Sequence, residues 1–150
     1  MCGMQNAAML DTLVYESRAD ARLTDAELEV ILIGSRVRNG RRGITGALLK
    51  RDARILQLIE GPTAEIERTF AAIAASPLHH DVRVLRRETG LDRVFDRWHM
   101  GFYDFQTLHG RSDSTDAWLR ALPALQVQAS TNPVLAVLLE RWNEVSNGAA

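Results

Sequence analysis

The chain has little cysteine, little excess charge and no long apolar run. Its single cysteine, Cys2, excludes an internal disulfide framework and a cysteine-built metal site, which favours a reducing compartment. Eighteen Lys and Arg against nineteen Asp and Glu leave a net charge of -1, so no general field attracts nucleic acid or anionic membrane. No run approaches the roughly 20 apolar residues of a transmembrane helix, and residues 1–10 lack a secretory signal pattern. These absences predict a cytoplasmic protein that binds neither membrane nor nucleic acid directly.

What the sequence does contain suits one folded domain. Apolar residues make up 46% and charged residues 25% of the 150 positions, an ordinary balance for a globular protein of this size. Apolar periodicity and turn residues predict a β-α-β-β-α-β order with an extra strand. This order is typical of the ferredoxin-like α+β fold, an antiparallel sheet with two helices on one face. The expected strands are Leu10–Ser17, Ile44–Lys50, Arg54–Glu60, Val82–Arg87 and Phe95–Phe102, and the expected helices are Asp25–Val37 and Thr63–Ala75.

The C-terminal part of the chain is expected to cover the other face of this sheet. Residues 106–114 are polar and are interpreted as a linker. Beyond them, Thr115–Leu122 and Pro133–Asn147 carry apolar residues at helical spacing. We therefore predict a binding domain over residues 10–105, followed by the linker and by a helical cap or oligomerisation segment over residues 115–147.

Polar side chains stand at apolar-facing positions of the expected strands. Gln57 shares a face with Ile55, and Tyr15 shares a face with Leu13. Burying an unpaired amide or phenol costs about 1–3 kcal/mol. Such a residue is therefore either a hydrogen-bonded structural residue or part of a site. Taken alone, a glutamine in a strand is more often structural.

Asn39 follows the first expected helix, where an asparagine ordinarily serves as a left-handed C-cap. It also belongs to a wider pattern of five separated pieces. These are Leu13-Val14-Tyr15-Glu16-Ser17, Asn39 with Gly43-Ile44-Thr45-Gly46, Leu56-Gln57-Leu58-Ile59-Glu60-Gly61, the His79-His80 region, and Phe95-Asp96-Arg97-Trp98-His99-Met100. In their order and spacing, over about residues 10–105, the sequence resembles the BLUF family of flavin-binding blue-light sensors.

The resemblance implies a blue-light photoreceptor that binds FAD between the two helices of a ferredoxin-like fold. Within it, Asn39 matches the residue that holds the pyrimidine edge of the flavin. The residues assigned to the light response are Tyr15, Gln57, Trp98, Met100 and Ser17, and those assigned to cofactor binding are Asn39, Gln57, Tyr15, Arg38, Ile44 and His79.

These residue types suit the chemistry that the family performs. An excited flavin is a strong oxidant, and the phenol of Tyr15 is the expected donor of an electron and then a proton. An amide has a donor end and an acceptor end, so rotation or tautomerisation of Gln57 changes hydrogen bonds without changing net charge. The expected result is a small red shift of absorption, which Trp98 and Met100 on a neighbouring strand would pass to the far side of the sheet.

One stretch departs from the family pattern. Where the family commonly shows Asp-x-Arg-His, this chain has Ser76-Pro77-Leu78-His79, without the carboxylate and the guanidinium. Arg36, Arg41 and Arg42 stand near the expected cofactor mouth and suit the diphosphate of FAD, although a solvated basic turn explains them equally well. The alternative function is therefore a BLUF-like domain that has lost its flavin or light response and acts as a protein-interaction module.

Other classes of protein find little support in the sequence. The glycine-rich phosphate loop of acylphosphatases is missing, and so are the paired aromatic residues of ferredoxin-like RNA-binding modules. His79 and His80 lack the further ligands that a metal site needs. We expect no enzyme and no metal, and a signal that leaves through a homo-oligomer or an unidentified downstream protein.

Overall fold

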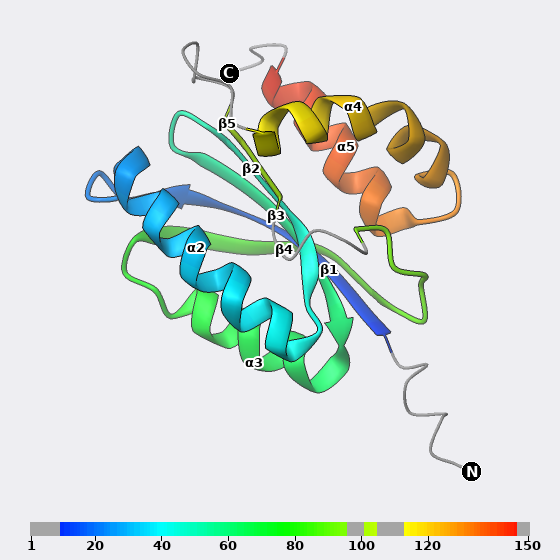
Figure 1. Ribbon diagram of the computed structural model, residues 1–150, viewed down its shortest axis with the longest axis horizontal. Helices are drawn as coiled ribbons and strands as arrows, with labels where there is room; N and C mark the ends of the chain where they lie inside the picture. The colour runs from blue at the N-terminus through cyan, green and yellow to red at the C-terminus, as the bar shows by residue number, and fades with distance from the viewer. Residues whose placement is uncertain (1–9, 96–100, 105–112, 147–150) are drawn as a thin grey trace.

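The protein forms one five-stranded sheet with helices on both of its faces (Figure 1). The computed structural model describes residues 10–95, 101–104 and 113–146. Its strands are β1 (Leu10–Ala19), β2 (Thr45–Arg51), β3 (Arg54–Pro62), β4 (His79–Thr89) and β5 (Gly101–Asp104). Their order is β4-β1-β3-β2-β5, in which the first four strands pair antiparallel and β5 runs parallel to β2. This confirms the predicted ferredoxin-like α+β fold with an extra strand.

The extra strand does not begin where the sequence pattern predicts. Of the expected Phe95–Phe102, Gly101 and Phe102 lie in β5, residues 96–100 lie outside the described residues, and Phe95 lies in a loop. The backbone N–H of Phe95 donates to the Glu60 carboxylate at 2.6 Å. The prediction of a strand at Phe95 is therefore wrong, because a side chain and not a neighbouring strand satisfies its backbone donor.

Two helices, α2 (Asp25–Arg42) and α3 (Thr63–Ala74), cover one face of the sheet (Figure 1). The N-terminus of α2 is capped by the Thr24 hydroxyl, which accepts the Glu27 N–H at 3.1 Å. The helix continues past the expected end at Val37 and closes at Gly43, whose φ of 71° is left-handed. Asn39 is therefore not the C-cap; it lies in the last turn, and its backbone carbonyl accepts the Gly43 N–H.

The C-terminal helices, α4 (Asp113–Gln128) and α5 (Pro133–Ser146), lie on the opposite face (Figure 1). The helix expected to end at Leu122 in fact continues through Pro123. The N-terminus of α5 is capped by the Asn132 side chain, which accepts the N–H groups of Val134 and Leu135 at 3.1 and 3.0 Å.

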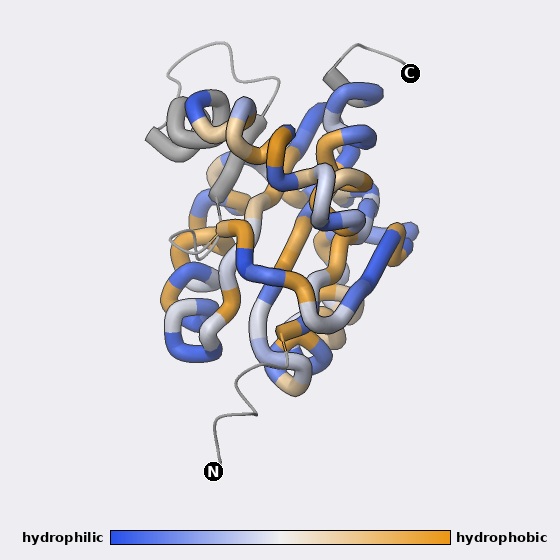
Figure 2. Tube along the Cα trace, turned by 90° about the vertical axis from the view of Figure 1, so that its right-hand side faces the viewer, coloured by the Kyte–Doolittle hydropathy of each residue, from blue (hydrophilic) through white to orange (hydrophobic). Residues whose placement is uncertain are grey.

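The sheet separates two hydrophobic clusters, because successive strand residues point to opposite faces. Figure 2, in which hydrophobic residues are orange, shows apolar stretches running through the middle of the molecule. On the α2/α3 side, the cluster includes Leu13, Tyr15, Leu28, Leu32, Leu48, Ile59 and Ile66. On the α5 side, it includes Val14, Leu49, Leu56, Leu58, Leu135, Leu138 and Leu139.

A buried carboxylate lies at the end of β3, on the face opposite to Gln57. The two oxygens of Glu60 accept the N–H groups of Val94 and Phe95 at 2.8 and 2.6 Å. The Thr45 hydroxyl donates to it at 2.8 Å and itself accepts from Arg93 at 2.8 Å. Burial raises the pKa of the Glu60 carboxyl, and the two backbone N–H groups oppose that rise. Glu60 thereby fixes the loop that follows β4.

Within the part of the chain that the structure describes, no helix combines the length and the apolar character needed to cross a bilayer.

Removal of a buried leucine from α5 tests whether this helix belongs to the folded core. Leu138→Ala should lower the free energy of unfolding by about 2–5 kcal/mol, because it leaves a cavity in the cluster on the α5 side. Urea denaturation measures the loss. The control is Val127→Ala in α4, where the side chain is 73% exposed and the change should stay within about 0.5 kcal/mol. A Leu138→Ala protein as stable as the parent would contradict the assigned packing.

Loss of the Glu60 carboxylate should destabilise the fold and release the loop it holds. Glu60→Ala leaves two backbone N–H groups without their acceptor, and we expect a loss of about 3 kcal/mol. Hydrogen exchange at Val94 and Phe95 should accelerate as well. Glu88→Ala, which removes a surface ion pair to Arg86, is the control and should cost at most about 1 kcal/mol.

Candidate functional site

A cavity of about 310 Å³ lies between α2, α3 and the sheet. Leu28 and Leu32 of α2, Ile73 of α3 and Ile59 of β3 give it apolar walls. Its size and its mixture of apolar walls with a few polar side chains are typical of a small-molecule pocket. The polar or charged side chains among its lining residues are Tyr15, Ser35, Arg38, Asn39, Arg42, Gln57, Thr69, Ser76 and His79.

Tyr15 and Gln57 form the centre of this site. They stand directly opposite each other on β1 and β3, so both side chains point to the same face of the sheet. The Tyr15 hydroxyl donates a hydrogen bond to the Gln57 carbonyl oxygen. Burial raises the pKa of the Tyr15 phenol well above its ordinary value, so the hydroxyl keeps its proton at neutral pH. A protonated phenol is thus held against one end of an amide.

Two rings surround the phenol of Tyr15. The ring of Phe70 lies 5.6 Å from it between centroids, and the ring of His79 lies 6.3 Å from it, edge-on. The His79 Nε2–H donates to the Ile73 carbonyl at 2.6 Å, and Nδ1 lies 2.8 Å from the Ser17 hydroxyl. In the neutral imidazole, Ser17 is therefore the donor to Nδ1. These contacts fix the orientation of both the imidazole and the phenol.

The C-terminal end of α2 supplies the polar groups on the other side of the cavity. Asn39 is buried and lines it together with Arg38 and Arg42. Arg42 donates to the Thr69 hydroxyl at 3.5 Å and lies 3.9 Å from the Glu65 carboxylate, so it links α2 to α3. The cavity thus has one face with an amide and a phenol and another with an amide and guanidinium groups.

The structure brings most of the site residues expected from the sequence to one place. Tyr15, Gln57, Asn39, Arg38 and His79 all line the cavity. Ser17 does not line the cavity but is hydrogen-bonded to His79, which does. Ile44 is buried on the same face of the sheet without lining the cavity. Trp98 and Met100 lie outside the described residues.

The cavity also contains residues that the sequence pattern does not assign to the site. Ser76 and Leu78, the residues at which the sequence is expected to depart from the family pattern, both line the cavity. Phe70 and Thr69 also lie at the site, although no sequence motif marks them. In the sequence, Ile66, Phe70 and Ile73 are at helical spacing and so share one face of α3, but only the structure brings Phe70 to Tyr15.

The residues present fit a flavin. The apolar walls suit a flat ring system, and the buried amides of Asn39 and Gln57 each offer a donor and an acceptor, as a pyrimidine edge requires. Arg38 and Arg42 offer positive charge to a phosphate. Among the described residues, no three His, Cys, Asp or Glu side chains gather as metal ligands.

Comparison with known proteins agrees with this fit. The solved dark-state structure of the BLUF protein BlrB is 31% identical and superposes with a TM-score of 0.66, over 93% of this chain and 98% of BlrB. The blue light- and temperature-regulated antirepressor BluF of Escherichia coli K12 is 33% identical over 73% of this chain, and the photoactivated adenylate cyclase subunit beta of Euglena gracilis is 27% identical over 78%. The matches span 27% and 12% of those two relatives, respectively.

A family model covers most of the chain as well. The model described as "Sensors of blue-light using FAD" matches residues 10–101, a range that contains β1 to β4, both helices around the cavity and the first residue of β5. The chain therefore belongs to the BLUF family, the sensors of blue light that use FAD.

Proposed function

We propose that this protein is a blue-light photosensor whose response runs through Tyr15 and Gln57. The observation that carries the proposal is the hydrogen bond from the Tyr15 hydroxyl to the Gln57 carbonyl inside the cavity. It joins a protonated phenol to a side chain that has a donor and an acceptor end. A change at either residue is thereby transmitted to the other.

The cavity lined by Tyr15, Gln57 and Asn39 would hold FAD, which would supply the absorption of blue light and an electron acceptor in its excited state. Tyr15 would give an electron and its phenolic proton to the bound flavin, and it would take both back once Gln57 has rearranged. The raised pKa of Tyr15 means that the proton is present on the phenol before illumination. His79 and Phe70 hold the ring of Tyr15, so the distance from phenol to amide changes little while charge moves.

Gln57 is the switch in this mechanism. Its carbonyl oxygen accepts from Tyr15, so the dark arrangement has a defined orientation. Once Tyr15 has lost its proton it can no longer donate, and the amide gains by presenting its NH₂ end to the phenol oxygen. The proton and electron then return to Tyr15, with Gln57 left in its new hydrogen-bond arrangement. The rearrangement of Gln57 therefore leaves the net charge and the covalent structure unchanged, and it involves only side chains of the β1–β3 pair.

Asn39 and Arg38 are the residues that we expect to hold the cofactor. Asn39 is buried in the last turn of α2 and is one of the residues that line the cavity. Arg38 lines the same region and donates to the Ser35 hydroxyl at 3.3 Å. His79 also lines the cavity, but its contacts with Ser17 and Ile73 suit it to positioning Tyr15.

The output of the sensor is proposed to be a protein interaction and not catalysis. The Euglena relative is a cyclase subunit and the E. coli relative is an antirepressor, and both extend far beyond the region matched here. BlrB, by contrast, matches over nearly its whole length. We infer that the signal reaches a homo-oligomer or a downstream protein in the cytoplasm through the helices on the second face of the sheet.

A second candidate function rests on Ser76 and Leu78. Both face the cavity at positions where the family commonly carries a carboxylate and a guanidinium. If their absence abolishes flavin binding, the domain acts as an interaction module without light response. Colour separates the two candidates: the sensor is yellow when purified or after incubation with FAD, whereas the interaction module stays colourless.

Substitutions at the central pair test the light response. Tyr15→Phe removes the hydroxyl with little change in packing, and Gln57→Leu removes the two-ended amide at similar volume. Both should bind FAD but lack the reversible red shift that blue light produces in the parent. Difference spectra before and after illumination measure it. A normal red-shifted product in Gln57→Leu would refute the proposed switch.

Removal of the Asn39 amide tests cofactor binding. Asn39→Ala should weaken FAD binding by about 1–3 kcal/mol, roughly 5- to 150-fold in dissociation constant, since buried polar atoms of the flavin lose a partner. Equilibrium titration with FAD gives the affinity. The matched control is Asn143→Ala in α5, on the other side of the sheet, which should bind FAD like the parent. Equal affinity of the Asn39→Ala protein would remove Asn39 from the site.

A further inference from the structure

The residue after Tyr15 connects the opposite face of the sheet to a C-terminal helix. Because side chains alternate along a strand, Tyr15 points into the cavity while Glu16 points to the face covered by α5. The side chain of Glu16 is 20% exposed and that of Arg141, in α5, is 26% exposed. The Glu16 Oε1 accepts a hydrogen bond from Arg141 at 2.9 Å. A single peptide unit of β1 thus separates the phenol in the cavity from an ion pair to α5.

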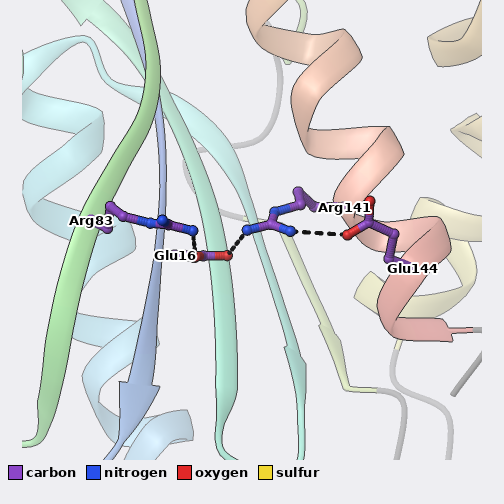
Figure 3. Close-up of polar contacts among 4 residues, drawn as sticks. All are labelled: Glu16, Arg83, Arg141 and Glu144. Carbon is purple, nitrogen blue, oxygen red and sulfur yellow. Dashed lines mark hydrogen bonds and ion pairs between the residues drawn. The ribbon is translucent and has the colours of Figure 1, made fainter. Parts of the chain in front are cut away.

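This ion pair is part of a chain of four charged side chains (Figure 3). The second oxygen of Glu16 accepts from Arg83 of β4, whose side chain is 64% exposed. Arg141 uses its other terminal nitrogen to donate to Glu144 at 2.9 Å, within α5. Positive and negative charges alternate from β4 through β1 to α5. Partly exposed ion pairs add little to stability, but a guanidinium that spans two carboxylates has a defined geometry.

The pairing of β1 is irregular at this point. Its register with β4 shifts between Val14 and Tyr15 and shifts again between Glu16 and Arg18. Its register with β3 runs without interruption through the same residues. Irregular pairing of this kind interrupts the ladder and lets a strand bend locally. Tyr15 and Glu16 therefore form a two-residue segment between two irregularities on the β4 side, where they pair with Val84 and Arg83, while on the other side they pair with Gln57 and Leu56.

Apolar side chains make much of the contact between α5 and the sheet. Val134, Leu135, Leu138 and Leu139, which precede Arg141, pack into the cluster on the α5 side, and Trp142, which follows it, packs against the same cluster. Apolar contact is non-directional and tolerates small tilts of a strand. The ion pair to Glu16 depends on direction and distance, and it lies toward the C-terminal end of the helix. It is the part of this contact that a small movement of β1 changes most.

We propose that the Glu16–Arg141 ion pair couples the light state of the Tyr15–Gln57 pair to the C-terminal half of α5. This inference rests on the proposed photosensor function. Rearrangement at Tyr15 tilts the segment between the two register shifts, changes the alignment of Glu16 with Arg141, and so alters how firmly residues 140–144 are held. Light then acts on α5 because the Glu16–Arg141 ion pair differs in strength between the dark state and the illuminated state.

Hydrogen exchange of the FAD-loaded full chain, in the dark and under blue light, tests the coupling. In the parent, illumination should change the exchange of backbone amides around Arg141 by about fivefold or more, the lower end of typical coupling between sites. In Arg141→Met the ratio of light to dark exchange should fall to about one, while the red shift of the same sample remains. The apolar packing of α5 is kept in this variant, and Glu16 retains Arg83 as a partner.

Further variants separate the ion pair from a general effect of charge. Glu16→Gln should abolish the light dependence in the same way, and the double variant should do no more than either single one, because both act on one contact. Arg120→Met, at an exposed position of α4, removes the same charge and should behave like the parent. An unchanged ratio in Arg141→Met, or no light dependence around Arg141 in a parent that shows the red shift, would overturn the coupling alone. A parent without the red shift would overturn the photosensor proposal and the coupling with it.

Discussion

Burial of β1 on both faces is the constraint on which the rest of the structure depends. This strand pairs with β3 on one side and β4 on the other, and helices cover it above and below. A polar side chain on such a strand needs a partner from another element. Asp11 accepts hydrogen bonds from Arg87 and Thr89, and Glu16 accepts hydrogen bonds from Arg83 and Arg141. Tyr15 donates a hydrogen bond to Gln57. The contacts to which we assign the light response are therefore also the contacts that make this strand compatible with its position.

The chemical character of the site follows from the same burial. A phenol in water is a weak acid that titrates near pH 10, whereas Tyr15 is enclosed by Phe70, His79 and the strand opposite, and its pKa is raised. Enclosure keeps the proton in place and leaves the amide of Gln57 as its acceptor. The arrangement thus stores one proton at a defined atom, next to a cavity of the size and polarity that a flavin ring requires.

Much of this could be predicted from the sequence, for reasons that the structure makes visible. Period-2 patterns placed Tyr15 and Gln57 on inner faces, and they lie there because one face of each strand meets α2 and α3. The failures arose where two signals competed or where the partner is distant in sequence. Gly43 and Asn39 are both C-cap residues, and the glycine took the left-handed position, so Asn39 became part of the helix. Pro123 ordinarily marks a helix end, yet α4 continues through it.

The polar contacts between distant elements were beyond the reach of pattern reasoning. Glu60 shares the parity of Leu56 and Leu58, which predicts an inward side chain, but nothing in the sequence shows that the loop after β4 folds back to donate to it. In the same way, nothing in the sequence distinguishes Arg141 from a solvated arginine, because its partner Glu16 is brought to it only by the position of α5 over β1. Pairings of this kind depend on tertiary arrangement and not on local propensity.

The separation of the apolar interior into two clusters has a consequence for how such a domain can change over time. Side chains on opposite faces of the sheet do not touch, so substitutions in one cluster add to substitutions in the other nearly independently. Residues of the cavity face and residues of the α5 face can therefore change largely separately, except along β1, which contributes side chains to both faces.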